Sequence, residues 1–115
     1  QERYDLLLKN LPIIKPFQAE NTYSALHLYP IQIVLNKVQK SRKQIFYELR
    51  DSGIGVNVHY MPIHMQPYYR QFGFNEGDFP NSEDYYSQAI SIPLFHSMSL
   101  VQQDEVIAKL KMIIK

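Results

Sequence analysis

The chain has 115 residues, enough for one domain with a single modest hydrophobic core. Twelve basic and eleven acidic side chains leave a formal charge of +1, which excludes the strongly basic surface of a typical nucleic-acid-binding domain. The absence of cysteine excludes disulfides, thiolate metal sites and thiol catalysis, and it fits a cytoplasmic protein. No apolar stretch approaches the roughly 20 residues of a membrane span, so we expect no membrane partner. Because the chain begins on Gln1, inside a helical pattern, we expect it to be part of a longer protein.

The first predicted elements are a helix and a strand. Residues 2–11 carry apolar side chains at helical spacing, and Pro12 and Pro16 end this helix. Residues 24–35 are rich in β-branched and aromatic side chains and predict a strand. Since proline cannot donate a backbone hydrogen bond, Pro30 inside this strand predicts an edge position or a bulge.

A helix over residues 42–52 has the clearest local signals. Ser41 and Gln44 form a capping-box signature, and Gly53 stands where a helix ends. The side chains expected to face the core are Ile45, Phe46 and Leu49. Residues 54–60 then alternate between two faces and predict a second strand. Its apolar face is expected to comprise Ile54, Val56, Val58 and Tyr60, and its polar face Gly55, Asn57 and His59.

Two more helices and a strand are predicted in the next part of the chain. A short helix has Pro67 in its first turn and Gly73 after its end. Another begins at the cap residue Ser82, with acidic residues in its first turn. Residues 91–95 predict a strand or an extended edge.

The last helix follows a second capping box, formed by Ser99 and Gln102. Its apolar face comprises Val106, Ile107, Leu110 and Ile114. The order of helices and brief strands predicts an α+β fold, a single domain over residues 1–115 in which helices cover one face of a short sheet.

Residues 58–70, VHYMPIHMQPYYR, gather two histidines and three tyrosines around prolines. His59 and His64 lie five residues apart across Pro62, a spacing that suits neither helix nor strand ligands, so we expect no metal site. The tyrosines are not interleaved with Lys or Arg, which argues against a nucleic-acid stacking surface. No serine sits in a Gly-x-Ser-x-Gly elbow of the hydrolase type, and no Gly-rich loop could hold a phosphate. Two interpretations stay open: the histidines line the rim of a ligand pocket, or they are only hydrogen-bonded at the edge of the core.

Three segments carry a family resemblance: GIGVNVHYMPIHMQPYYR, GDFPNSEDYYSQAISIPLF and SLVQQDEVIAKLKMII. Together with SALHLYPIQI upstream, they resemble the C-terminal part of the sugar aminotransferases of the DegT/DnrJ/StrS type, over residues 4–114. The most specific element is the His-Tyr-x-Pro-x-His-x-x-Pro-Tyr-Tyr run. The likeness extends to the branch that aminates UDP-linked 4-keto sugars for pseudaminic acid, although His96 stands where a proline is expected.

The resemblance implies a pyridoxal phosphate (PLP) enzyme that aminates keto sugars carried on nucleotides, typically with glutamate as donor, and that forms a homodimer. The chain would be the small C-terminal domain of a fold-type I aminotransferase, a short, mostly antiparallel sheet covered by helices. The lysine that holds PLP, its acidic partner and the phosphate-binding groups belong to the large N-terminal domain of the family. We therefore expect no catalytic and no cofactor-binding residue in this chain, which alone would be inactive.

The matching positions imply substrate-binding residues. His59 and Tyr60 match the His-Tyr pair of the family beside the sugar, and His64 matches its second histidine. Tyr68 and Tyr69 are expected to pack the short helix against the sheet. The expected function of the full protein is amination of a keto sugar for polysaccharide or glycoconjugate synthesis. The alternative is a non-catalytic ligand- or protein-binding module that kept the fold and lost the PLP chemistry.

Overall fold

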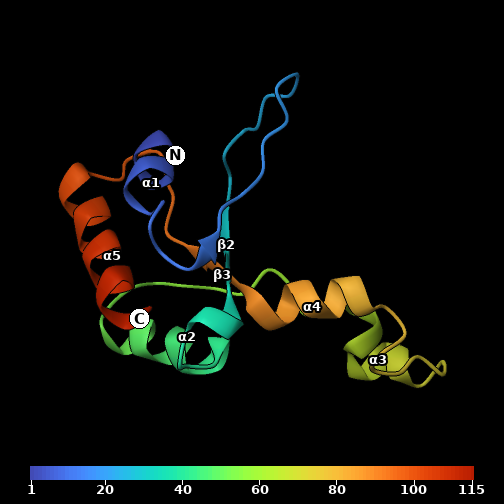
Figure 1. Ribbon diagram of the computed structural model, residues 1–115. Helices are drawn as coiled ribbons and strands as arrows, with labels where there is room; N and C mark the ends of the chain where they lie inside the picture. The colour runs from blue at the N-terminus through green and yellow to red at the C-terminus, as the bar shows by residue number, and fades with distance from the viewer.

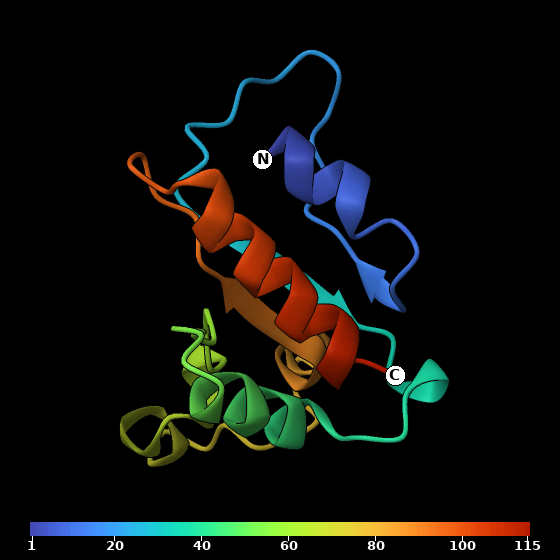
Figure 2. The same cartoon turned by 90° about the vertical axis from the view of Figure 1, so that its left-hand side faces the viewer.

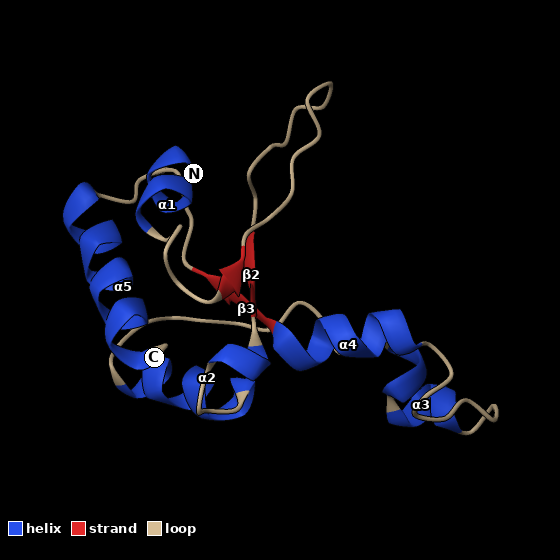
Figure 3. Cartoon of the chain, viewed as in Figure 1, coloured by secondary structure: helices blue, strands red, loops and turns tan.

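A computed structural model describes residues 1–115. The helices are α1 (Glu2–Leu7), α2 (Arg42–Asp51), α3 (Pro67–Arg70), α4 (Pro80–Gln88) and α5 (Leu100–Ile113), with short 3-10 turns η1 (Leu35–Lys37) and η2 (Ile63–Met65). The strands are β1 (Ile13–Ile14), β2 (Tyr29–Ile33) and β3 (Ala89–Ile92). They form one small antiparallel sheet among the helices (Figure 3), so the predicted α+β class is confirmed.

The sheet has the order β1-β2-β3, which makes β2 its central strand. β2 as a whole is therefore not an edge strand, but β1 is too short to reach Pro30, so the edge position predicted from this proline holds locally. β1 pairs only with Gln32 and Ile33, whereas Pro30 is paired with Ser91 of β3 alone. Beside Pro30 the sheet has a strand on one side only, so the missing N–H of the proline breaks no ladder there.

One hydrophobic core lies between the sheet and α5, which crosses one face of the sheet with α1 and α2 at its sides (Figure 2). Alternate residues of β2 are buried, as expected of a strand with one face on the core. The residues on the opposite face of β2 are only partly buried. The core comprises Tyr4, Leu8, Tyr29, Ile31, Ile33, Ile45, Leu49, Ile54, Val56, Ile90, Ile92, Val106, Ile107, Leu110, Ile113 and Ile114.

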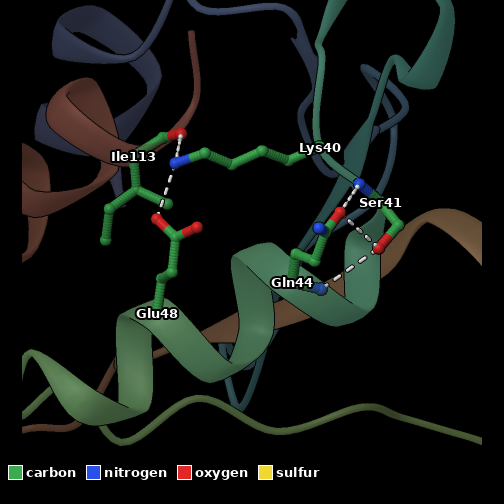
Figure 4. Close-up of polar contacts among 5 residues, drawn as sticks. All are labelled: Lys40, Ser41, Gln44, Glu48 and Ile113. Carbon is green, nitrogen blue, oxygen red and sulfur yellow. Dashed lines mark hydrogen bonds and ion pairs between the residues drawn. The ribbon is translucent and has the colours of Figure 1, made fainter.

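Both predicted capping boxes are confirmed. At α2 the Ser41 hydroxyl accepts the Gln44 backbone N–H, and the Gln44 side chain accepts the Ser41 N–H (Figure 4). The same pair of bonds joins Ser99 and Gln102 at α5. Close to the first cap, the Lys40 Nζ donates to Glu48 Oε2 at 2.6 Å and to the carbonyl of Ile113 at 3.3 Å (Figure 4). This lysine thereby ties α2 to the end of α5.

The predicted core face of α2 is confirmed for two of its three residues. Ile45 and Leu49 are fully buried, whereas Phe46 is only partly buried and packs against the core from its edge. The Ser82 cap predicted for the next helix is wrong. α4 begins three residues earlier, with Phe79 as its N-cap and Pro80 in its first turn, because the fixed φ of proline suits that turn and its missing N–H costs nothing there.

Residues 54–60 do not form the predicted strand. The segment touches β3 at a single bridge between Asn57 and Ser91, which is too little for a ladder. Ile54 and Val56 are buried, as expected, but Val58 is half-buried and Tyr60 is exposed. The alternation therefore places the first half of the segment correctly, and the second half leaves the sheet toward Pro62.

The α3 and α4 helices form an arm that extends away from the rest of the molecule (Figure 1). The Cα radius of gyration is 15.4 Å, compared with about 13 Å for a compact chain of this length. Tyr68 and Tyr69 of α3 are exposed, and α3 contacts η2 at the far end of the arm. The expectation that these tyrosines pack the short helix against the sheet is wrong. No helix is both long and apolar enough to cross a bilayer.

Candidate functional site

An open cleft of about 400 Å³ lies where the segment after α2 passes β3. The backbones of Asn57 and Ser91 form a bridge between these two elements, and both residues line the cleft. The loop before β2 and the chain after β3 supply the rest of the wall. The cleft is lined by His27, Leu28, Gly55, Asn57, His59, Ser91, Ile92, Pro93, Leu94 and Phe95.

His59 is half-buried in the wall of this cleft. Its Nδ1 lies 2.8 Å from the Oγ of Ser91, and its ring meets the Tyr60 ring edge to face, with centroids 4.5 Å apart. Tyr60 is 69% exposed beside it. His59 thus lines the cleft, whereas Tyr60 stands exposed beside it and is not among the lining residues.

The polar side chains of the cleft are two histidines, an asparagine and a serine. His27, Asn57, His59 and Ser91 stand among apolar side chains, and the lining includes no Lys, Arg, Asp or Glu. A phosphate would need basic groups, and a hard cation would need carboxylates. A wall that mixes apolar side chains with a few hydrogen-bonding groups suits a polar ligand without formal charge, such as a sugar ring.

His64 lies in a different place. It is buried in η2, where its Nε2 is 2.7 Å from Glu83 Oε1 of α4 and its ring packs on Phe79 with centroids 4.7 Å apart. It borders a second, aromatic pocket of about 400 Å³, which shares no residue with the first. The structure therefore does not bring His64 to the cleft of His59. Of the two interpretations of these histidines, the one that fits His64 is a side chain hydrogen-bonded within the domain.

The carboxylate of Glu83 holds the arm together. Besides His64, the backbone N–H groups of Gly77 and Phe79 donate to it. Burial acts to raise the pKa of Glu83, but these hydrogen bonds outweigh it and hold the pKa below its ordinary value. The carboxylate thus fixes the loop before α4 around the buried histidine.

Three polar residues of the cleft were not predicted as site residues: His27, Asn57 and Ser91. Asn57 shares the predicted polar face with His59, and this alternation could have identified it. Ser91 and His27 lie far along the chain and carry no local signal. No three His, Cys, Asp or Glu side chains gather as a metal site.

A comparison with known protein families shows to which family the chain belongs. The DegT/DnrJ/EryC1/StrS aminotransferase family model matches residues 1–111. The chain belongs to this family.

Individual members of the family agree with this assignment. The Bacillus subtilis spore coat polysaccharide biosynthesis protein SpsC is 39% identical over 98% of this chain and 30% of its own length. The PLP form of Streptococcus pneumoniae Spr1654 superposes with a TM-score of 0.88 and 28% identity, over 97% of this chain and 29% of that one. Helicobacter pylori PseC, an aminotransferase of pseudoaminic acid biosynthesis, has a TM-score of 0.86 and 27% identity, over 98% of this chain and 30% of that one. The chain thus spans less than a third of the length of these relatives.

No lysine lines either of the two pockets described above. A Schiff-base lysine needs a desolvated pocket that lowers its pKa. Lys15 donates to the Asp5 carbonyl at 2.6 Å, and Lys40 is paired with Glu48. Lys109 is half-buried, and the other five lysines are exposed: Lys9, Lys37, Lys43, Lys111 and Lys115.

Proposed function

We propose that this chain is the C-terminal domain of a larger, cytoplasmic, PLP-dependent aminotransferase that works as a homodimer. The full enzyme transfers an amino group, typically from glutamate, to a nucleotide-linked keto sugar for polysaccharide or glycoconjugate synthesis. The observation that carries the proposal is the cleft with His59 in its wall and no Lys, Arg, Asp or Glu in its lining, in a chain of an aminotransferase family. SpsC supports the polysaccharide context, and PseC supports the pseudaminic acid branch.

The domain contributes substrate binding in this proposal. PLP, when bound to the full enzyme, supplies the electron sink for amino transfer, and its lysine comes from the part of the enzyme outside this chain. His59 and Tyr60 hydrogen-bond the sugar and exclude water from it. The apolar wall of Leu94 and Phe95 packs against the carbon skeleton of the ring.

His64 takes an indirect part. Its predicted contact with the substrate finds no support in the geometry, because its Nε2 is already paired with Glu83. In our proposal it keeps the arm of α3 and α4 folded, and any influence on the substrate acts through that arm.

The test uses the full-length enzyme with a UDP-linked 4-keto sugar and glutamate. His59→Asn and Tyr60→Phe are expected to leave the PLP absorbance unchanged and to lower kcat/KM for the sugar by about tenfold or more, as for a lost polar contact to substrate. The half-reaction with glutamate should change less than that with the sugar. His96→Asn is the matched control, since His96 is exposed and lies outside the cleft. Equal activity of the His59 variant and this control would refute the assignment.

The alternative function is a ligand- or protein-binding module that kept the fold and lost the PLP chemistry. Borohydride reduction of the full-length protein distinguishes the two functions. One PLP trapped per subunit on one lysine supports the enzyme, and the absence of a trapped cofactor supports the module.

A further inference from the structure

Ser91 of β3 is a buried polar residue that contacts residues 54–60 through both its backbone and its side chain. Its backbone exchanges two hydrogen bonds with Asn57, Asn57 N–H to Ser91 O at 3.1 Å and Ser91 N–H to Asn57 O at 2.8 Å. Its side-chain Oγ lies 2.8 Å from the Nδ1 of His59. The residue is 4% exposed, and its neighbours Ile90 and Ile92 belong to the core.

These contacts matter because the segment has no other sheet partner. The bridge to Ser91 is its only pairing with β3, so the position of the His59 ring depends on few restraints. The Ser91 hydroxyl holds the ring from β3, which is itself fixed by its pairing with β2 and by the core residues Ile90 and Ile92. The Tyr60 ring restrains it from the solvent side.

The hydrogen bond also decides which nitrogen faces the ligand. With Nδ1 engaged by Ser91, Nε2 is the nitrogen left to the cleft. A hydroxyl can donate to Nδ1 or accept from it, so this holds for both neutral tautomers of the imidazole. Such a partner orients the ring without giving it a charge.

We propose that Ser91 is the positioning residue of His59, and that its hydroxyl presents the Nε2 of His59 to a hydroxyl or carbonyl oxygen of the sugar. This inference rests on the proposed function, because it assumes that His59 binds the sugar. Ser91 itself acts through the histidine and does not contact the reacting atoms. Its role is comparable to that of the group that hydrogen-bonds the other ring nitrogen of a metal-ligating histidine and so fixes the orientation of the ring.

The experiment measures the steady-state kinetics of the full-length enzyme with a UDP-linked 4-keto sugar. Ser91→Ala is expected to raise the KM for the sugar by about 3- to 10-fold, the range for one lost hydrogen bond, with the PLP spectrum and the KM for glutamate unchanged. Ser91→Thr keeps the hydroxyl and should restore the KM. Ser87→Ala is the matched control, because the Ser87 hydroxyl donates to the Asp84 carbonyl on the exposed side of α4.

A double-mutant cycle with His59→Ala separates positioning from a loss of folding. If Ser91 acts through the histidine, Ser91→Ala has no further effect on the KM in the His59→Ala background. A full additional loss there would overturn the inference, as would a normal KM for Ser91→Ala beside an impaired His59→Ala. If His59→Ala itself retains the normal KM, the proposed function fails, and the inference fails with it. Because the cycle does not use Ser91→Thr, it tests the inference even if that variant does not fold.

Discussion

Replacing Leu49 with alanine removes a fully buried side chain from the last turn of α2. Leu49 is 0% exposed and belongs to the core between the sheet and α5. Truncating such a leucine costs about 2–5 kcal/mol, depending on how far the cavity collapses. α2 is anchored by its capping box and by the Lys40 contacts to α5, so little collapse is expected and the cost lies in the upper half of this range. A domain of this size is stable by only about 5–15 kcal/mol.

Denaturant unfolding followed by circular dichroism measures this loss. Leu100→Ala is the matched control, since it makes the same change in α5 at a side chain that is 67% exposed. The control should change the free energy of unfolding by about 0.5 kcal/mol or less. Phe46→Ala, at a partly buried side chain, should cost less than the ~3–5 kcal/mol of a fully buried phenylalanine. Equal losses for Leu49→Ala and Leu100→Ala would refute the assignment of the α2 core face.

Two further predictions concern the cofactor and the arm. Borohydride treatment of the 115-residue chain with PLP should label several lysines weakly and none stoichiometrically, because no lysine lines the cleft of His59 or the aromatic pocket; peptide mapping showing one fully labelled lysine would contradict this. The lowered pKa of Glu83 means that its contribution to the arm is present above the ordinary value of 4.5 and is lost as the pH falls below it. The NMR shift of the Gly77 amide should therefore titrate with a midpoint below 4.5, and Glu83→Gln should abolish this titration.

The elements that were predicted correctly are those that short-range chemistry specifies. The capping boxes at Ser41 and Ser99 join residues three positions apart, so the sequence contains the whole interaction. The apolar stripe of α5 is equally local, and its four predicted core residues are all buried. Helices of this kind form with the same boundaries in many tertiary contexts.

The strands were predicted less well because their partners are distant. β1 is two residues long and too short for any periodic signal, yet it makes β2 the central strand. Residues 54–60 have a strand pattern, but only Asn57 finds a partner. The alternation of apolar and polar residues indicates which face of an extended segment is buried. Whether the segment is a strand depends on its backbone pairing with another segment.

The candidate site was accessible from the sequence only in part. The alternation before Pro62 places His59 on the polar face, and the structure puts it in the wall of a cleft. His64 has the same residue type and lies in the same run, but a carboxylate 19 positions later holds it in another pocket. Ser91, 32 positions after His59, could not be associated with it before the fold was known.

The two ends of the chain are joined to each other, and this constrains how the domain can be made. The Tyr4 hydroxyl in α1 donates to the carbonyl of Pro93 at 2.9 Å, and Arg3 pairs with Asp104 of α5 at 2.6 Å. On the ribosome, α1 emerges roughly ninety residues before these partners exist. Its apolar face therefore has no packing partner, together with most of β2, until β3 and α5 have also been synthesised. Apolar surface that stays exposed in this way favours aggregation.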